Sequence, residues 1–74
     1  MSDTMILPDI PATIHEARIR AGLSQRQLGE ALGYDGSYAE VSVRRWELGS
    51  RPVPIDKVRQ LAAVLGLTLD DLIP

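Results

Sequence analysis

The chain has 74 residues, a formal net charge of −2, no cysteine and one histidine. A chain of this length forms a single domain close to the lower limit for folding on a hydrophobic core alone. Without cysteine there is no disulfide or thiolate metal site, and a single histidine does not make a zinc site, so we expect no metal and no cofactor. No stretch approaches the roughly 18 apolar residues of a membrane span, so we expect a cytoplasmic protein with no membrane partner.

The distribution of charge is more informative than its sum. Residues 1–17 carry a charge of −3 and residues 60–74 a charge of −2, whereas residues 18–59 hold all eight basic residues and carry +3. A mildly basic middle is compatible with binding to nucleic acid, although known binders tend to be basic as a whole.

Residues 1–11 contain two prolines and no helical period, which predicts an irregular N-terminal arm. The arm is either frayed or packed through its apolar run Met5–Leu7, on the domain or on a second copy of it. Residues 12–74 are expected to form one helical domain.

Two helices are predicted next, over residues 12–21 and 25–32. Pro11 and Gly22 bound the first, and Ser24 is a good N-cap for the second. Gly29 lies inside the second helix and costs about 1 kcal/mol relative to alanine, so we expect close approach of a neighbouring helix there. The expected inward-facing residues are Ile14, Ala17, Ala21, Leu28, Ala31 and Leu32.

A third helix is predicted over residues 38–48, after a turn at Tyr34–Gly36. Ser37 and Glu40 have the S-x-x-E spacing of a capping box, and Gly49 can end the helix in the left-handed conformation. Its apolar face comprises Ala39, Val43 and Trp46. Two adjacent arginines, Arg44 and Arg45, fall on the remaining surface.

The last third of the chain begins with a proline-containing loop at residues 50–54. Apolar residues at helical spacing, beginning with Ile55, predict a helix over 55–65 that ends at Gly66. Thr68 is expected to cap a last short helix that ends at residue 72 or 73. The predicted fold class is therefore all-α, a compact bundle of five short helices.

From Ile14 to Ile73 the sequence resembles the Cro/C1-type (XRE family) helix-turn-helix proteins, which include phage repressors, restriction-modification controllers and antitoxins. The matching stretches are IHEARIRAGLSQRQLGEALG, VRRWELG and VRQLAAVLGLTLDDL. The resemblance implies a lambda-repressor-like DNA-binding fold. In that fold the second helix crosses the DNA backbone and the third enters the major groove.

The resemblance also implies a structural salt bridge between Arg18 and Glu47, which would join the first helix to the third. Arginine suits this role because its planar fork holds a carboxylate bidentately. One departure from the family is clear, since Tyr34–Ser37 looks like an insertion of about four residues. Counting back from Trp46 puts Glu40 and Val41 at the base-reading positions, which is the alignment we adopt; counting from the predicted cap puts Tyr38 and Ala39 there.

The expected DNA contacts follow from side-chain chemistry and family position. Arginine donates bidentately to guanine, an aliphatic side chain can contact a thymine methyl, and a carboxylate can accept from cytosine. Glu40 has the capping box as its alternative role, Tyr38 has packing over the inserted turn, and His15 is expected to be a surface residue. The base-reading candidates are Glu40, Val41, Ser42 and Arg45, and the backbone candidates are Gln25, Arg26, Tyr38, Arg44 and Arg51.

We therefore expect a sequence-specific regulator of transcription that binds double-stranded DNA, acting as a repressor and a homodimer on operator half-sites. The alternative is an antitoxin or other protein-interaction module that uses the same domain and binds a toxin or another regulator. No cysteine nucleophile, phosphate-binding loop or paired-carboxylate cleft supports an enzyme, and no small-molecule ligand is expected.

Overall fold

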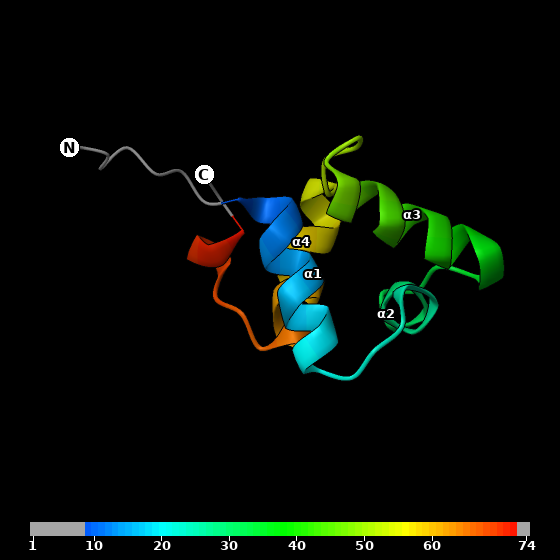
Figure 1. Ribbon diagram of the computed structural model, residues 1–74, viewed down its shortest axis with the longest axis horizontal. Helices are drawn as coiled ribbons and strands as arrows, with labels where there is room; N and C mark the ends of the chain where they lie inside the picture. The colour runs from blue at the N-terminus through cyan, green and yellow to red at the C-terminus, as the bar shows by residue number, and fades with distance from the viewer. Residues whose placement is uncertain (1–8, 73–74) are drawn as a thin grey trace.

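The computed structural model describes residues 9–72, which form four α-helices and one 3₁₀ helix, with no strand in this range (Figure 1). The all-α fold class is confirmed, and the last of the five expected helices is a 3₁₀ turn. The expected packing of Met5–Leu7 and the alternative helix end at residue 73 fall outside the described residues. The elements are α1 (Ile10–Arg20), α2 (Gln25–Ala31), α3 (Gly36–Leu48), α4 (Ile55–Leu65) and η1 (Leu69–Asp71).

Helix α1 begins at Ile10, two residues before the predicted start. The side chain of Asp9 accepts a hydrogen bond of 3.2 Å from the backbone N–H of Ala12, which caps the helix. Pro11 lies in the first turn, where a proline is tolerated because its N–H would have no intrahelical partner. Ile10 and Pro11 therefore belong to the helix and not to the irregular arm.

Helices α2 and α3 pack closely at a glycine. Ser24 caps α2 as predicted, and it forms a reciprocal capping box with Gln27. A Cβ placed on Gly29 would lie 2.6 Å from the Cβ of Ala39 and closer still to the backbone carbonyl of that residue. The close approach expected at Gly29 is confirmed, and only glycine allows it.

The predicted capping box of α3 is wrong. The helix begins at Gly36, Asp35 is its N-cap residue, and Ser37 already lies within the first turn. The reason is tertiary, because the ring of Tyr34 packs against Trp46, with ring centroids 5.9 Å apart, and against Tyr38, with centroids 5.3 Å apart. These contacts hold the inserted segment against α3, so it extends the helix at its start. The end of α3 is as predicted, with Gly49 in the left-handed region at φ 76°.

The core lies where the helices converge, and Figure 1 shows α1 and α4 next to each other with α3 running outward from them. Ile14, Leu28, Val43 and Leu61 are fully buried, and Trp46 is 3% exposed. Two positions expected to face inward, Ala21 and Ala31, are exposed, and so is Ile55, the first residue of the apolar period of α4. Ala21 lies beyond the end of α1, Ala31 lies to the side of the inward face of α2, and Ile55 in the first turn of α4 extends past its neighbours.

Replacing Gly29 tests the close approach of α2 and α3. In an ordinary helix interior, glycine to alanine stabilises by about 1 kcal/mol. Here we expect Gly29→Ala to lower the free energy of unfolding by about 1–3 kcal/mol, because the new methyl group overpacks the contact with Ala39. Urea denaturation measures the change. An unchanged or higher stability of Gly29→Ala would contradict the close packing.

Candidate nucleic-acid interface

Helix α3 has one buried side and one free side. Ala39, Val43 and Trp46 are buried, and with 3.6 residues per turn the opposite side carries Ser37, Val41, Arg44, Arg45 and Leu48. We call these five residues the outer face. Leu48 is 72% exposed and both arginines are exposed. Within residues 9–72 neither Arg44 nor Arg45 forms an ion pair, so their charges remain available to an anionic partner.

The orientation of this face is fixed by a buried ion pair. Arg18 on α1 donates from Nε to Oε2 of Glu47 at 2.5 Å and from Nη2 to Oε1 at 3.1 Å. The two side chains are 9% and 5% exposed. Arg18 also donates from Nη1 to the carbonyl oxygen of Leu23 at 2.8 Å, before the start of α2. A single guanidinium therefore connects α1, the α1–α2 loop and the end of α3.

Two further side chains contact the Glu47 carboxylate. His15 Nδ1 lies 2.9 Å from Oε1, and Gln25 donates from Nε2 to the same oxygen at 3.2 Å. Burial raises the pKa of Glu47, but the hydrogen bonds from Arg18, His15 and Gln25 and the positive charge of Arg18 outweigh burial and hold the pKa below its usual value. Side chains from α1 and α2 thus stabilise the Glu47 carboxylate of α3 in its ionised form.

Beside this network lies a shallow concavity of about 620 Å³ between the start of α1 and the outer face of α3. The predicted backbone contacts Gln25 and Arg44 both line it, together with His15. The bond to Glu47 fixes the Gln25 amide, which carries a second N–H group. The remaining lining residues are Asp9, Pro11, Ala12, Glu47 and Leu48.

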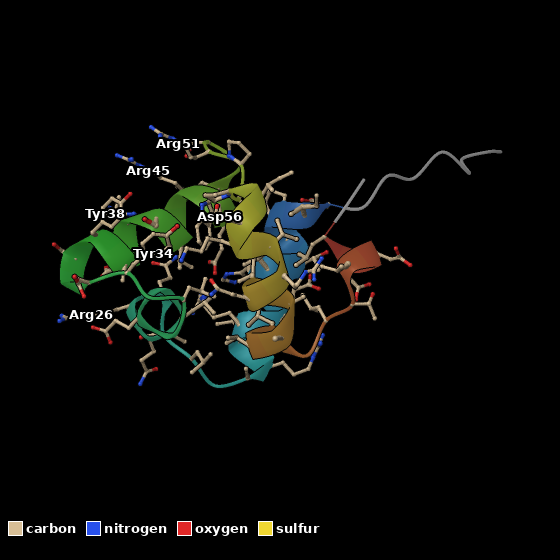
Figure 2. The ribbon with its side chains drawn as sticks, turned by 180° about the vertical axis from the view of Figure 1, so that it is seen from behind. Arg26, Tyr34, Tyr38, Arg45, Arg51 and Asp56 are labelled. Atoms are coloured by element: carbon tan, nitrogen blue, oxygen red, sulfur yellow. The ribbon has the colours of Figure 1, made fainter. Side chains whose placement is uncertain are left out.

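The other side of α3 carries an aromatic cluster. Lys57 on α4 donates from Nζ to the carbonyl oxygen of Leu32 at 2.8 Å, and the same nitrogen lies 5.1 Å from the centre of the Tyr34 ring. Tyr38 packs edge-on against Tyr34 and remains 62% exposed. Figure 2 shows Arg45 and Arg51 extending from the same edge of the molecule, with Tyr38 nearer the start of α3.

The other predicted site residues differ in exposure and lie on both α2 and α3. Glu40 is exposed, and Val41 and Ser42 are half-buried on α3. Arg26 lies on α2, away from Arg45 and Arg51 (Figure 2), and pairs with Glu30 at 3.1 Å on the surface. The alternative base-reading position Ala39 is fully buried and has no surface to offer a base.

Sequence reasoning missed the contact between His15 and the ion pair. His15 was expected to be a surface residue, and its side chain is 54% exposed, yet Nδ1 bonds to Glu47. Its position three residues before Arg18 was the available signal, because residues at i and i+3 share a helix face.

Comparison with known proteins agrees with this geometry. A family model described as helix-turn-helix matches residues 14–72. The chain therefore belongs to the helix-turn-helix family of the Cro/C1 (XRE) type and is a DNA-binding regulator. No curated protein and no solved structure gives a significant match. Within residues 9–72 no helix has both the length and the apolar character to cross a membrane.

Removing Arg18 should expose how much the fold depends on the ion pair. We expect Arg18→Ala to lower the free energy of unfolding by about 3 kcal/mol, because Glu47 is left as a buried and incompletely paired charge. Arg20→Ala is the matched control: Arg20 is an exposed arginine on the same helix and its loss should stay within about 0.5 kcal/mol. Thermal or urea unfolding compares the two variants, and equal stabilities would contradict the role given to the pair.

Proposed function

We propose that this protein is a sequence-specific repressor of transcription that places α3 in the major groove of its operator. The observation that carries the proposal is the outer face of α3, whose two arginines form no ion pair within residues 9–72, on a helix held by a buried ion pair. The 13 residues of α3 make a rod about 20 Å long, and the major groove, about 12 Å wide, admits an α-helix.

The side chains divide by their position on α3. Arg45 is proposed to read guanine through O6 and N7, and Val41 to contact a thymine methyl, with Glu40 and Ser42 as further base contacts. The phosphate contacts are proposed on either side of the helix: Gln25 and Arg44 next to α1, Tyr38 near the start of α3, and Arg51 in the loop before α4. Arg26 would add a contact from α2. Phosphate contacts fix the register of the helix, and base contacts supply the sequence preference.

The two classes of contact predict different mutant behaviour. Once selection from a random duplex library has given the preferred site, Arg45→Ala should weaken binding to it by about 1–3 kcal/mol and relax the preference at one position. Arg51→Ala should weaken binding to preferred and unrelated duplexes alike, and reduce the slope of log K against log salt by about 1. Fluorescence anisotropy at several salt concentrations measures both effects.

Arg20→Ala serves as the control for lost charge, since Arg20 is exposed outside the proposed contact set. If selection yields no preferred site, or if Arg45→Ala weakens all duplexes equally, sequence reading by α3 is refuted.

The proposal includes a homodimer, because a single domain makes few base contacts and two copies on half-sites about 34 Å apart would supply the missing affinity. An apolar groove of about 630 Å³ supports it. Ile55 is 90% exposed and Leu69 is 38% exposed, and both line this one groove, so they belong to a single exposed apolar patch of the kind that marks interaction sites. Leu72 lines the same groove but is 5% exposed, so it belongs to the core.

Ile55→Glu should therefore give a monomer at concentrations where the parent protein is a dimer, and should weaken operator binding. Because Ile55 is 90% exposed, the free energy of unfolding should change by no more than about 0.5 kcal/mol. Sedimentation equilibrium measures the mass, and Ile19→Glu on α1, at a residue 57% exposed and outside the groove, is the matched control. A variant that stays dimeric would remove the groove from the interface.

The same groove also supports the alternative that the domain acts as an antitoxin or similar module, with a different protein in place of the second copy. A parent protein that is monomeric at high concentration, but binds a neighbouring gene product through Ile55, would favour that alternative.

A further inference from the structure

We infer that His15 is an additional phosphate-binding residue of this domain, one that contacts the DNA backbone only when its imidazole is protonated. The inference rests on the proposed insertion of α3 into the major groove, which brings a phosphate group to the concavity that Gln25 and Arg44 line.

The geometry gives the two ring nitrogens different surroundings. Nδ1 is held at 2.9 Å from Oε1 of Glu47, a carboxylate whose side chain is 5% exposed. Because the two nitrogens of an imidazole point in divergent directions, this bond turns Nε2 away from the buried carboxylate. The His15 side chain is 54% exposed, and no hydrogen bond through Nε2 is found within residues 9–72.

Protonation of the His15 imidazole is compatible with its contact to Glu47. In the imidazolium both nitrogens are donors, so Nδ1–H donates to Glu47 while Nε2–H is available to a phosphate oxygen. In the neutral ring the single proton lies on Nδ1, because a lone pair there would face the ionised Glu47 carboxylate at 2.9 Å, and Nε2 is then only an acceptor. The protonated ring therefore keeps its bond to Glu47 and gains an outward-facing donor together with a positive charge.

The charges around His15 mean that its protonation decides whether the concavity carries a net positive charge. Asp9 and Glu47 line the concavity with two negative charges and Arg44 with one positive charge, while Arg18, which does not line it, neutralises Glu47 through their ion pair. The neighbouring Glu16 on α1 is exposed, and α2 contributes the uncharged Gln25. A neutral His15 thus leaves the concavity itself balanced, and a protonated His15 gives it the net positive charge that attracts a phosphate.

The prediction can be tested cleanly because His15 is the only histidine in the chain. Histidine is the side chain whose charge ordinarily changes between about pH 5 and 8. Binding to a duplex should therefore tighten by about two- to five-fold between about pH 8 and about pH 6, the range expected for an exposed ion pair. The slope of log K against log salt should steepen by about 0.9 over the same interval, because one more phosphate is neutralised.

Two substitutions separate this role from a purely structural one. His15→Gln keeps a donor for Glu47 but carries no charge, so its affinity should equal that of the parent protein at about pH 8 and stay flat on acidification. His15→Lys carries its charge throughout and should bind tightly at both pH values. Calorimetry in buffers of different ionisation enthalpy should record uptake of up to about one proton when the parent protein binds DNA near pH 6.5, and none for either variant.

The measurement uses the full chain with both the selected operator and an unrelated duplex, because a phosphate contact does not depend on base sequence. Tightening on both duplexes supports the role of His15, even if selection reveals no preferred site and sequence reading fails. Sequence preference with a flat pH profile overturns the role of His15 and leaves the proposed function intact. The role of His15 is also overturned if His15→Gln weakens binding equally at both pH values and lowers the Tm. In that case His15 would only support Glu47 within the fold.

Discussion

The structure depends on the ion pair between Arg18 and Glu47. Burying two charges is expensive, and the cost is met only when their hydrogen bonds are nearly complete. Here the guanidinium bonds both carboxylate oxygens and the carbonyl of Leu23, while His15 and Gln25 complete the surroundings of the acid. Because these groups come from α1, α2 and the loop between them, α3 has one orientation in which Glu47 is satisfied. That requirement fixes the direction in which the outer face of α3 points.

The packing of α2 against α3 adds a second constraint, of shape and not of charge. Gly29 lets the backbone of α2 approach Ala39 more closely than any other residue would allow. A domain of 74 residues has a small core, so a single close contact of this kind contributes much to its definition. The ion pair at the end of α3 and the glycine contact near its start together hold both ends of the helix.

The negative net charge and the DNA-binding role are compatible because of where the charges lie. Two acidic residues beside the outer face are engaged within the fold, because Asp9 caps the start of α1 and Glu47 pairs with Arg18. The arginines of the outer face have no such partners within the described residues. The outer face therefore presents local positive charge, whatever the sum over the chain.

The segment Tyr34–Ser37, which the family resemblance marks as an insertion, lies at the start of α3. Tyr34 is held by Trp46, Tyr38 and Lys57, so the extra residues lie against α3 and lengthen it at its start. Tyr38 is thereby placed at the leading end of the helix, still largely exposed. The sequence indicated an insertion, but the direction in which it was accommodated depended on an aromatic cluster built from three elements.

The sequence by itself determined the features that depend on residues close together along the chain. The helical stretches, the cap at Ser24 and the stop at Gly49 follow from local backbone chemistry, and all were predictable for that reason. The need for a close neighbour at Gly29 was also predictable, because a glycine within a helix has a known cost. Family resemblance added the expectation that Arg18 and Glu47 would meet, which spacing along the chain could not supply.

Only the tertiary structure decided the features that depend on residues distant from one another in the sequence. The start of α3 was mispredicted because Ser37 satisfies the local capping pattern, whereas packing of Tyr34 on Trp46 fixes the actual start. Ile55 fits the apolar period of α4 but lies beyond the elements that would cover it. His15 lies next to a buried carboxylate 32 residues further along the chain. Periodicity identifies the face of a helix on which a residue lies, but the packing of the other helices decides what that face meets.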